Sequence, residues 1–199
     1  MVSLMAGTRS YHHGNLRAAL LESAERTLRR QGAGELSLRE LAREVGVSHA
    51  APRRHFADKQ ALLDALAADG FERLGREMEE AMAAAGDTLP EQLEAFAQAY
   101  VRFATEHATL LELMFTGKHR EPALHEAADR AFAAPLALFA TAQAAGQVVP
   151  GEPERVGIVA LSTLHGLASL ANNGMLGDYD LAELVGEAVD QLVLGLRPR

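Results

Sequence analysis

The side chains best suited to chemistry gather in one short segment, residues 48–59. This segment holds a hydroxyl, two imidazoles, a methyl group and three cationic groups, carried by Ser48, His49, Ala50, Arg53, Arg54, His55 and Lys59. Cations and imidazoles bind phosphate oxygens, whereas hydroxyl, imidazole and methyl groups can contact the edges of bases. The segment is therefore suited to bind a nucleic acid, and a solvated charged surface is the plainer alternative.

The predicted roles divide these residues by position. Phosphate contacts are predicted for Arg53, Arg54 and His55, and base contacts for Ser48, His49 and Ala50 at the start of the same helix. A helix cap is an equally good role for Ser48. Contacts to the sugar–phosphate backbone are also expected from Ser37, Arg39 and Lys59, which stand at the starts of neighbouring helices.

The net charge of −8 seems to oppose this interpretation, because an acidic protein repels phosphate. The charge is unevenly distributed, however: residues 1–60 carry a net +4 and the remaining residues a net −12. Such a split is a hint of a nucleic-acid-binding end, although uneven surface solvation would also produce it. Only the N-terminal part is expected to approach phosphate without repulsion.

Helices must position these residues. Ala, Leu, Glu and Arg dominate, and no stretch alternates apolar and polar residues, so no strand is expected. The first 60 residues predict three helices: one from Leu16 to Gly32, one that Ser37 and Glu40 open as a capping box and Gly46 closes, and one from Ser48 to about Phe56. Two short helices joined at a glycine turn are typical of a helix-turn-helix.

The rest of the chain predicts six more helices, at about 58–85, 88–106, 110–115, 122–145, 154–172 and 180–196. Asp58, Thr88 and Asp180 are expected to cap three of them, and Pro135 is expected to kink or break another. The predicted fold is all-α with about nine helices in two domains. These are a helix-turn-helix domain over 1–60, with a flexible arm over 1–14, and a helical bundle over 61–199.

The run LSLRELAREVGVSHAAPRRHFADKQALL, residues 36–63, resembles the tetracycline-repressor (TetR) family of transcriptional regulators. His55, Phe56 and Lys59 match the family pattern at the end of the recognition helix, and Arg53 stands where the family usually has a phosphate-contacting Tyr. The resemblance implies a homodimer that binds double-stranded operator DNA. The runs YHHGNLR and LHGLASL also resemble a subgroup with a Trp-His-Gly motif in its C-terminal domain, with Leu164 in place of the Trp.

A ligand pocket is predicted inside the acidic bundle, since aromatic and apolar residues with one histidine are expected to face inward on four helices. The candidates are Phe96, Tyr100, Phe103, Met114, Phe115, Phe132, Phe139, Leu161 and His165. An ordinary filled core is the alternative for each of them. No metal site or cofactor is expected, because the chain has no cysteine and its histidines show no metal-ligand spacing.

The last two helices carry apolar residues on more than one face, and the surplus predicts a two-fold dimer interface. The candidates are Val159, Leu167, Leu170, Val185, Leu192 and Val193. The working hypothesis is a cytoplasmic, homodimeric repressor that a small apolar or amphipathic effector releases from a pseudo-palindromic operator. A helical carrier or enzyme with an incidental hairpin is the rival, and no membrane association or enzymatic activity is expected.

Overall fold

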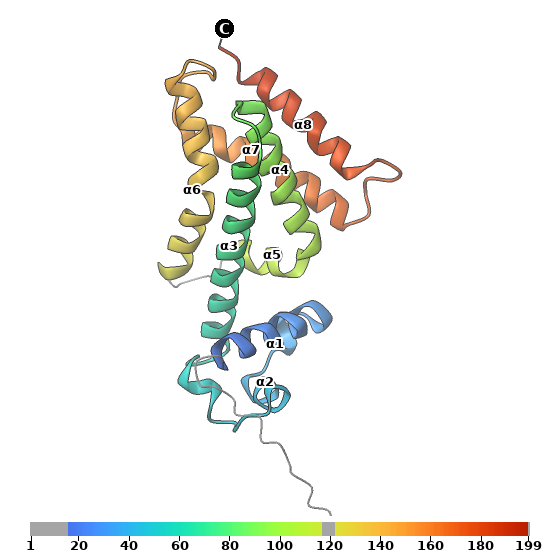
Figure 1. Cartoon of the computed structure of the whole chain (residues 1–199). Helices are drawn as coiled ribbons and strands as arrows, with labels where there is room; N and C mark the ends of the chain where they lie inside the picture. The colour runs from blue at the N-terminus through green and yellow to red at the C-terminus, as the bar shows by residue number, and fades with distance from the viewer. Residues whose placement is uncertain (1–15, 117–121, 199) are drawn as a thin grey trace, which may run out of the picture. The chain divides into compact units, whose positions relative to one another are not determined.

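The computed structural model describes residues 16–116 and 122–198 (Figure 1). The predicted arm, residues 1–14, lies outside the described residues. The α-helices are α1 (Leu16–Gln31), α2 (Leu38–Val45), α3 (Lys59–Ala84), α4 (Leu89–Glu106), α5 (Ala108–Phe115), α6 (Pro122–Ala144), α7 (Pro153–Asn172) and α8 (Leu181–Gly195). Two short 3₁₀ helices, η2 (Ala33–Glu35) and η3 (Pro52–Arg54), complete the described elements. The all-α prediction is confirmed, since no strand occurs over these ranges.

Eight α-helices occur in the described residues, where about nine helices were expected, and the expected α-helix from Ser48 to Phe56 is instead a turn followed by η3. Most backbone bonds here link residues three apart: Ala51 N–H donates to the Ser48 carbonyl at 3.0 Å, and His55 N–H to the Pro52 carbonyl at 2.9 Å, a carbonyl that also accepts from Phe56 N–H at 2.9 Å. In an α-helix the Ser48 carbonyl would accept from the N–H of residue 52, and proline has none. Pro52 therefore favours the tighter 3₁₀ form.

The chain divides into two compact units, residues 1–66 and 67–199, and the boundary falls inside α3. In the first unit α1 packs against α2, and both bury leucines in a common core with Leu62 and Phe56. Gly46 ends α2 with a left-handed backbone, φ 77° and ψ 33°, which a residue without Cβ adopts without strain. This turn leads the chain directly into the segment that carries the candidate DNA contacts.

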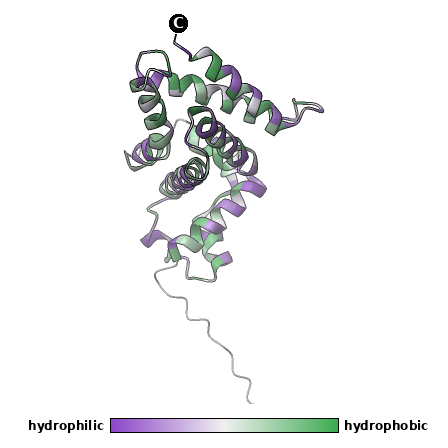
Figure 2. Ribbon diagram, turned by 45° about the horizontal axis from the view of Figure 1, so that its top comes forward, coloured by the Kyte–Doolittle hydropathy of each residue, from purple (hydrophilic) through white to green (hydrophobic). Residues whose placement is uncertain are grey.

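In the second unit α4 is the central element, since it packs against α6, α7 and α8 as well as α5. Its buried face includes Leu93, Tyr100 and Phe103. Hydrophobic and hydrophilic residues alternate along the helices instead of forming blocks (Figure 2), which is how amphipathic helices share one core. Within the described residues no helix is long and apolar enough to span a membrane.

Most of the predicted caps are present. Asp58 Oδ1 accepts from Ala61 N–H at 2.9 Å, Thr88 and Glu91 form a reciprocal capping box, and Asp180 Oδ1 accepts from Glu183 N–H at 3.0 Å. The capping box predicted at Ser37 is wrong, because this side chain makes no capping bond. Of the kink or break expected at Pro135, the break does not occur, since α6 continues through this buried proline.

Candidate nucleic-acid interface and internal pocket

The residues predicted to bind DNA lie on the surface of the first unit. Ser48, His49, Ala50, Arg53, Arg54 and His55 are all exposed. Between and beside them Pro52 and Phe56 are buried, and the Arg17 guanidinium lies 5.8 Å from the centre of the Phe56 ring. The buried pair anchors η3 at both ends, so the three side chains between them project into solvent.

A concavity of about 610 Å³ lies beside this segment, between η2, α2 and the turn after α2. Ser37, Arg39 and His49, all predicted DNA contacts, line it together with Arg43. The prediction missed Arg43, although its spacing of four residues from Arg39 places both guanidinium groups on one face of α2. The two arginines, a hydroxyl and an imidazole can contact phosphate oxygens, although Glu35 and Glu40 also line the concavity and offset the two positive charges.

Lys59, the third predicted backbone contact, is engaged within the unit. Its Nζ donates to the Gly34 carbonyl at 2.5 Å and so ties η2 to the start of α3. An ammonium group has three donors, and two remain for other partners. Lys59 therefore has a structural role in this unit in addition to the contact that the sequence predicts.

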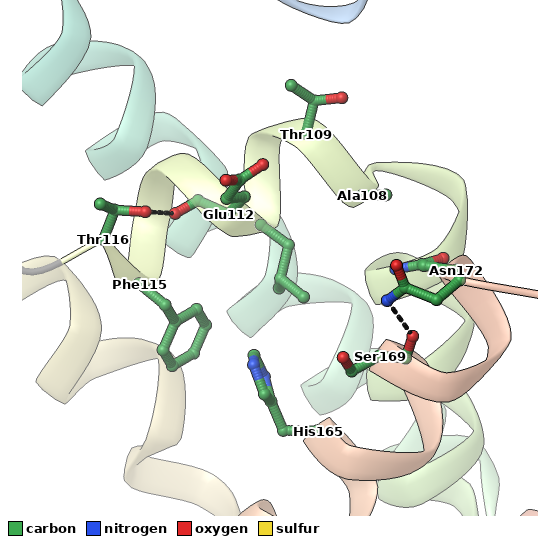
Figure 3. A pocket seen from close by; sticks show the side chains of 10 residues that line it. Ala108, Thr109, Glu112, Phe115, Thr116, His165, Ser169 and Asn172 are labelled. Carbon is green, nitrogen blue, oxygen red and sulfur yellow. Dashed lines mark hydrogen bonds between the residues drawn. The ribbon is translucent and has the colours of Figure 1, made fainter. Parts of the chain in front are cut away.

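The second unit contains a pocket of about 500 Å³ between α5 and α7 (Figure 3). Of the predicted pocket residues, only Phe115 and His165 line it. The other predicted residues lie away from it: Phe96, Tyr100, Phe103, Met114 and Phe139 are buried in the core, and Phe132 and Leu161 are partly buried. For these five buried residues, the alternative to a pocket lining, an ordinary filled core, describes their position.

Much of the pocket wall is polar, which the sequence did not indicate. Glu112 and Thr109 come from α5, and Ser169, Asn172 and Asn173 from the end of α7. Residues 109 and 112 are spaced for one helical face, but charged and amide side chains at helix ends usually indicate solvent exposure. No pattern in the sequence distinguishes polar side chains exposed at a helix end from polar side chains that line a pocket.

One buried hydrogen bond connects the core to this pocket. The Tyr100 hydroxyl lies 2.8 Å from His165 Nδ1, and the Phe115 and His165 rings are 5.1 Å apart. Burial raises the pKa of Tyr100 well above its usual range, so the hydroxyl keeps its proton. The bond engages Nδ1 on the core side of the ring, which leaves Nε2 as the ring nitrogen that can contact a molecule in the pocket.

The predicted dimer residues differ in exposure. Val159 and Leu170 are exposed, whereas Leu167, Leu192 and Val193 are partly buried. Val185 is fully buried within the protomer and belongs to its core, because α8 packs this side toward α4 and α7. Two exposed residues that were not predicted, Ile158 and Leu194, extend the apolar surface.

The eight-residue helix α2, the left-handed glycine turn that ends it and the exposed basic segment that follows define a helix-turn-helix DNA-binding protein. Residues 20–66 match the family described as bacterial regulatory proteins, tetR family. Residues 93–193, about half of the chain, match the tetracyclin repressor-like C-terminal domain. The chain belongs to the tetR family of transcriptional regulators, and it is a DNA-binding transcription factor, not an enzyme.

Solved structures share the fold over nearly the whole chain. A protein of unknown function from Rhodococcus sp. RHA1 is 45% identical, with a TM-score of 0.89 over 96% of this chain and 100% of that one. A TetR family transcription regulator from Marinobacter aquaeolei VT8 is 19% identical, with a TM-score of 0.76 over 94% and 97%. The regulator FadR from Bacillus subtilis, in complex with stearoyl-CoA, is 16% identical, with a TM-score of 0.70 over 90% and 99%. A search of the curated proteins gives no match.

Proposed function

We propose that this regulator is a homodimeric, cytoplasmic repressor that a small amphipathic molecule releases from a pseudo-palindromic operator. The observation that carries the proposal is the pairing of an exposed basic DNA-binding segment in one unit with a pocket of about 500 Å³ in the other. A transcription factor that also holds a ligand-sized cavity is suited to respond to a metabolite. The FadR structure, solved in complex with stearoyl-CoA, supports the idea that a regulator of this fold can bind a small molecule.

The contacts of α5 supply a route by which the ligand can act. Leu111 and Phe115 of α5 face the pocket, whereas Leu110 and Met114 pack on Gly70 of α3. A Cβ added at Gly70 would lie 2.7 Å from Met114 Sδ, so the two helices are in close contact. A ligand that shifts α5 would therefore shift α3, the helix that continues into the first unit.

Release requires that the ligand bind one arrangement of the protein more tightly than the other. A coupling of ~1–3 kcal/mol, about 5- to 150-fold in affinity, is typical of such switches. A mobility-shift assay with the DNA upstream of the regulator's own gene tests the proposal directly. We expect nanomolar binding that weakens steeply as salt concentration rises, because Lys and Arg contacts displace counterions from phosphate.

A metabolite panel added to the complex should contain compounds that release the DNA. Binding that is equal on random DNA or insensitive to salt would contradict a specific operator-binding role. Specific binding that no compound in the panel reverses, together with no ligand-induced rise in melting temperature, would contradict the effector role and leave a constitutive DNA-binding regulator.

A further inference from the structure

The pocket between α5 and α7 contains one negative charge and no described positive one. Glu112 lies at its rim, next to Thr109 and Thr116 (Figure 3), and no Lys or Arg is among the described residues that line the pocket. No ion pair or side-chain hydrogen bond of Glu112 is formed within residues 16–116 and 122–198. Its carboxylate is therefore available to a ligand.

The Phe115 ring lies one helical turn after Glu112, on the same face of α5. The side chain is 38% exposed although it is a large apolar group, and its ring meets the His165 ring within the pocket wall. An aromatic face beside a carboxylate attracts an organic cation, because the ring quadrupole and the negative charge act on the same positive group. An anion would be repelled by both.

The remaining polar groups of the pocket wall also favour a ligand that donates hydrogen bonds. The side-chain amides of Asn172 and Asn173 donate to the carbonyls of Ala104 and Ser169, at 3.1 and 2.7 Å, which leaves their oxygens as acceptors. The bond with Tyr100 engages His165 Nδ1 and leaves Nε2 as the ring nitrogen open to a ligand. A complementary ligand combines a positive or hydrogen-donating head with a polar group on its body.

We infer that the effector pocket takes a small organic cation, an amine that is protonated at neutral pH and carries a polar group on its body. The positive head lies between Glu112 and Phe115, and the polar group faces His165 Nε2. This inference rests on the proposed function only for the claim that binding is regulatory; the binding chemistry follows from the pocket itself.

The test uses three esters of similar size and the full-length protein in isothermal titration calorimetry. Dimethylaminoethyl benzoate is cationic at neutral pH, isoamyl benzoate is its neutral isostere with CH in place of the nitrogen, and benzoyloxypropanoate is an anion. We expect the cation to bind about tenfold more tightly than the neutral ester, and the anion more weakly than either.

Single substitutions test which side chains bind the cation. Glu112→Gln should weaken binding of the cation about fivefold and leave binding of the neutral ester unchanged, because the exposed carboxylate is replaced by a neutral group of the same shape. Phe115→Leu should reduce the preference for the cation while the apolar volume is kept. Glu187→Gln, at an exposed acid of α8 away from the pocket, should change nothing.

Equal affinity for the cation and its isostere, tighter binding of the anion, or no binding of any ester at millimolar concentration would overturn the inference. So would equal losses for both esters in Glu112→Gln. The proposed repressor function is tested separately by DNA release. If an anionic or neutral compound frees the operator, the inference of a cationic ligand is refuted and the repressor function is supported. If the cation binds without any effect on DNA binding, the inference of a cationic ligand is supported and the repressor function is refuted.

Discussion

At the scale of single residues, the pattern of burial around η3 decides which side chains can reach DNA. Pro52 and Phe56 are buried, and Arg53, Arg54 and His55 between them are exposed. Three consecutive residues of a 3₁₀ helix point in three different directions, since this helix has three residues per turn. We therefore expect the two arginines to contact different phosphates or one of them to remain in solvent.

Replacing Arg54 and His49 should separate affinity from specificity. Arg54→Ala removes a phosphate contact and should weaken binding to all DNA sequences alike, with a salt slope smaller by about one. His49→Ala should change the preferred bases, at a cost of ~1–3 kcal/mol for the wild-type site. Selection of binding sites from random DNA, combined with affinities measured at several salt concentrations, distinguishes the two outcomes. An unchanged site profile for His49→Ala would refute its role in base recognition.

Tyr100 should make stability depend on alkaline pH. Its burial raises the pKa above the ordinary Tyr value of about 10, so the folded chain holds the phenolic proton more tightly than the unfolded chain. This stabilisation is complete below pH ~10 and declines as the pH rises further, by up to ~1.4 kcal/mol per pH unit.

Urea unfolding of the wild type and Tyr100→Phe between neutral and alkaline pH measures this decline. The variant should be less stable by ~1 kcal/mol at neutral pH, where the hydrogen bond to His165 is lost, and should show a flatter alkaline limb. Parallel limbs in the two proteins would mean that Tyr100 does not supply the alkaline sensitivity.

At the scale of elements, one close contact between helix backbones in the second unit joins α3 to α6. A Cβ built on Gly75 would lie 2.9 Å from Ala131 Cα, which no real contact tolerates. Pro135 has no N–H, so the Ala131 carbonyl lacks its usual partner four residues later in α6. The glycine on α3 thus lies against the stretch of α6 backbone that the proline leaves unpaired.

Gly75→Ala should therefore destabilise the protein by ~1–3 kcal/mol, because helix backbones must separate to admit the methyl group. Gly157→Ala is the matched control: this glycine also lies inside a helix, but its added Cβ would have an ordinary contact of 3.9 Å with Leu136. The free energy of unfolding of the control should rise by ~0.5–1 kcal/mol, because Ala has a higher helix propensity than Gly. Chemical denaturation measures both, and a stabilised Gly75→Ala would show that the two helices separate at little cost.

Local signals predicted the elements well and the pocket poorly. Caps at Asp58, Thr88 and Asp180 were predictable, because short-range hydrogen bonds follow from residue type and spacing. The α-helix expected from Ser48 to about Phe56 is wrong, because Pro52 lacks the backbone donor that an α-helix needs there and one missing bond matters more in a segment this short. The pocket depends on which side chains of α5 and α7 meet, and the core residues Tyr100 and Phe103 have the same residue types as a pocket lining.

At the scale of the whole molecule, the uneven charge gives the regulator an orientation toward DNA. The N-terminal 60 residues carry a net +4 and the remainder a net −12, so the electrostatic field attracts phosphate only at the DNA-binding unit. The acidic remainder also bears the exposed apolar surface of α7 and α8. Self-association through that surface uses residues of the second unit and none of the candidate DNA contacts, which suits a dimer bound to two half-sites.

That apolar surface concentrates where α7 begins and α8 ends. Ile158 and Val159 are 65% and 59% exposed, and Leu194 is 64% exposed. The Val149 N–H donates to the Leu196 carbonyl at 2.8 Å, which holds the last turn of α8 close to the start of α7. Exposed branched side chains in one region of a water-facing surface are typical of a protein interface, and the same patch on two copies would form a two-fold contact.

Val159→Glu should convert the dimer to a monomer, because each copy would bury an unpaired carboxylate on or near the symmetry axis. Ala140→Glu, the same type of change at an exposed position of α6, should leave the dimer intact. Sedimentation velocity at micromolar concentration reports the oligomeric state, and titration of operator DNA with one half-site or two reports the consequence. A monomeric Val159→Glu should bind both DNAs with similar, weak affinity, whereas the wild type should strongly prefer two half-sites. If Val159→Glu remains dimeric and keeps that preference, the dimer forms through a different surface and the apolar patch on α7 and α8 requires another partner.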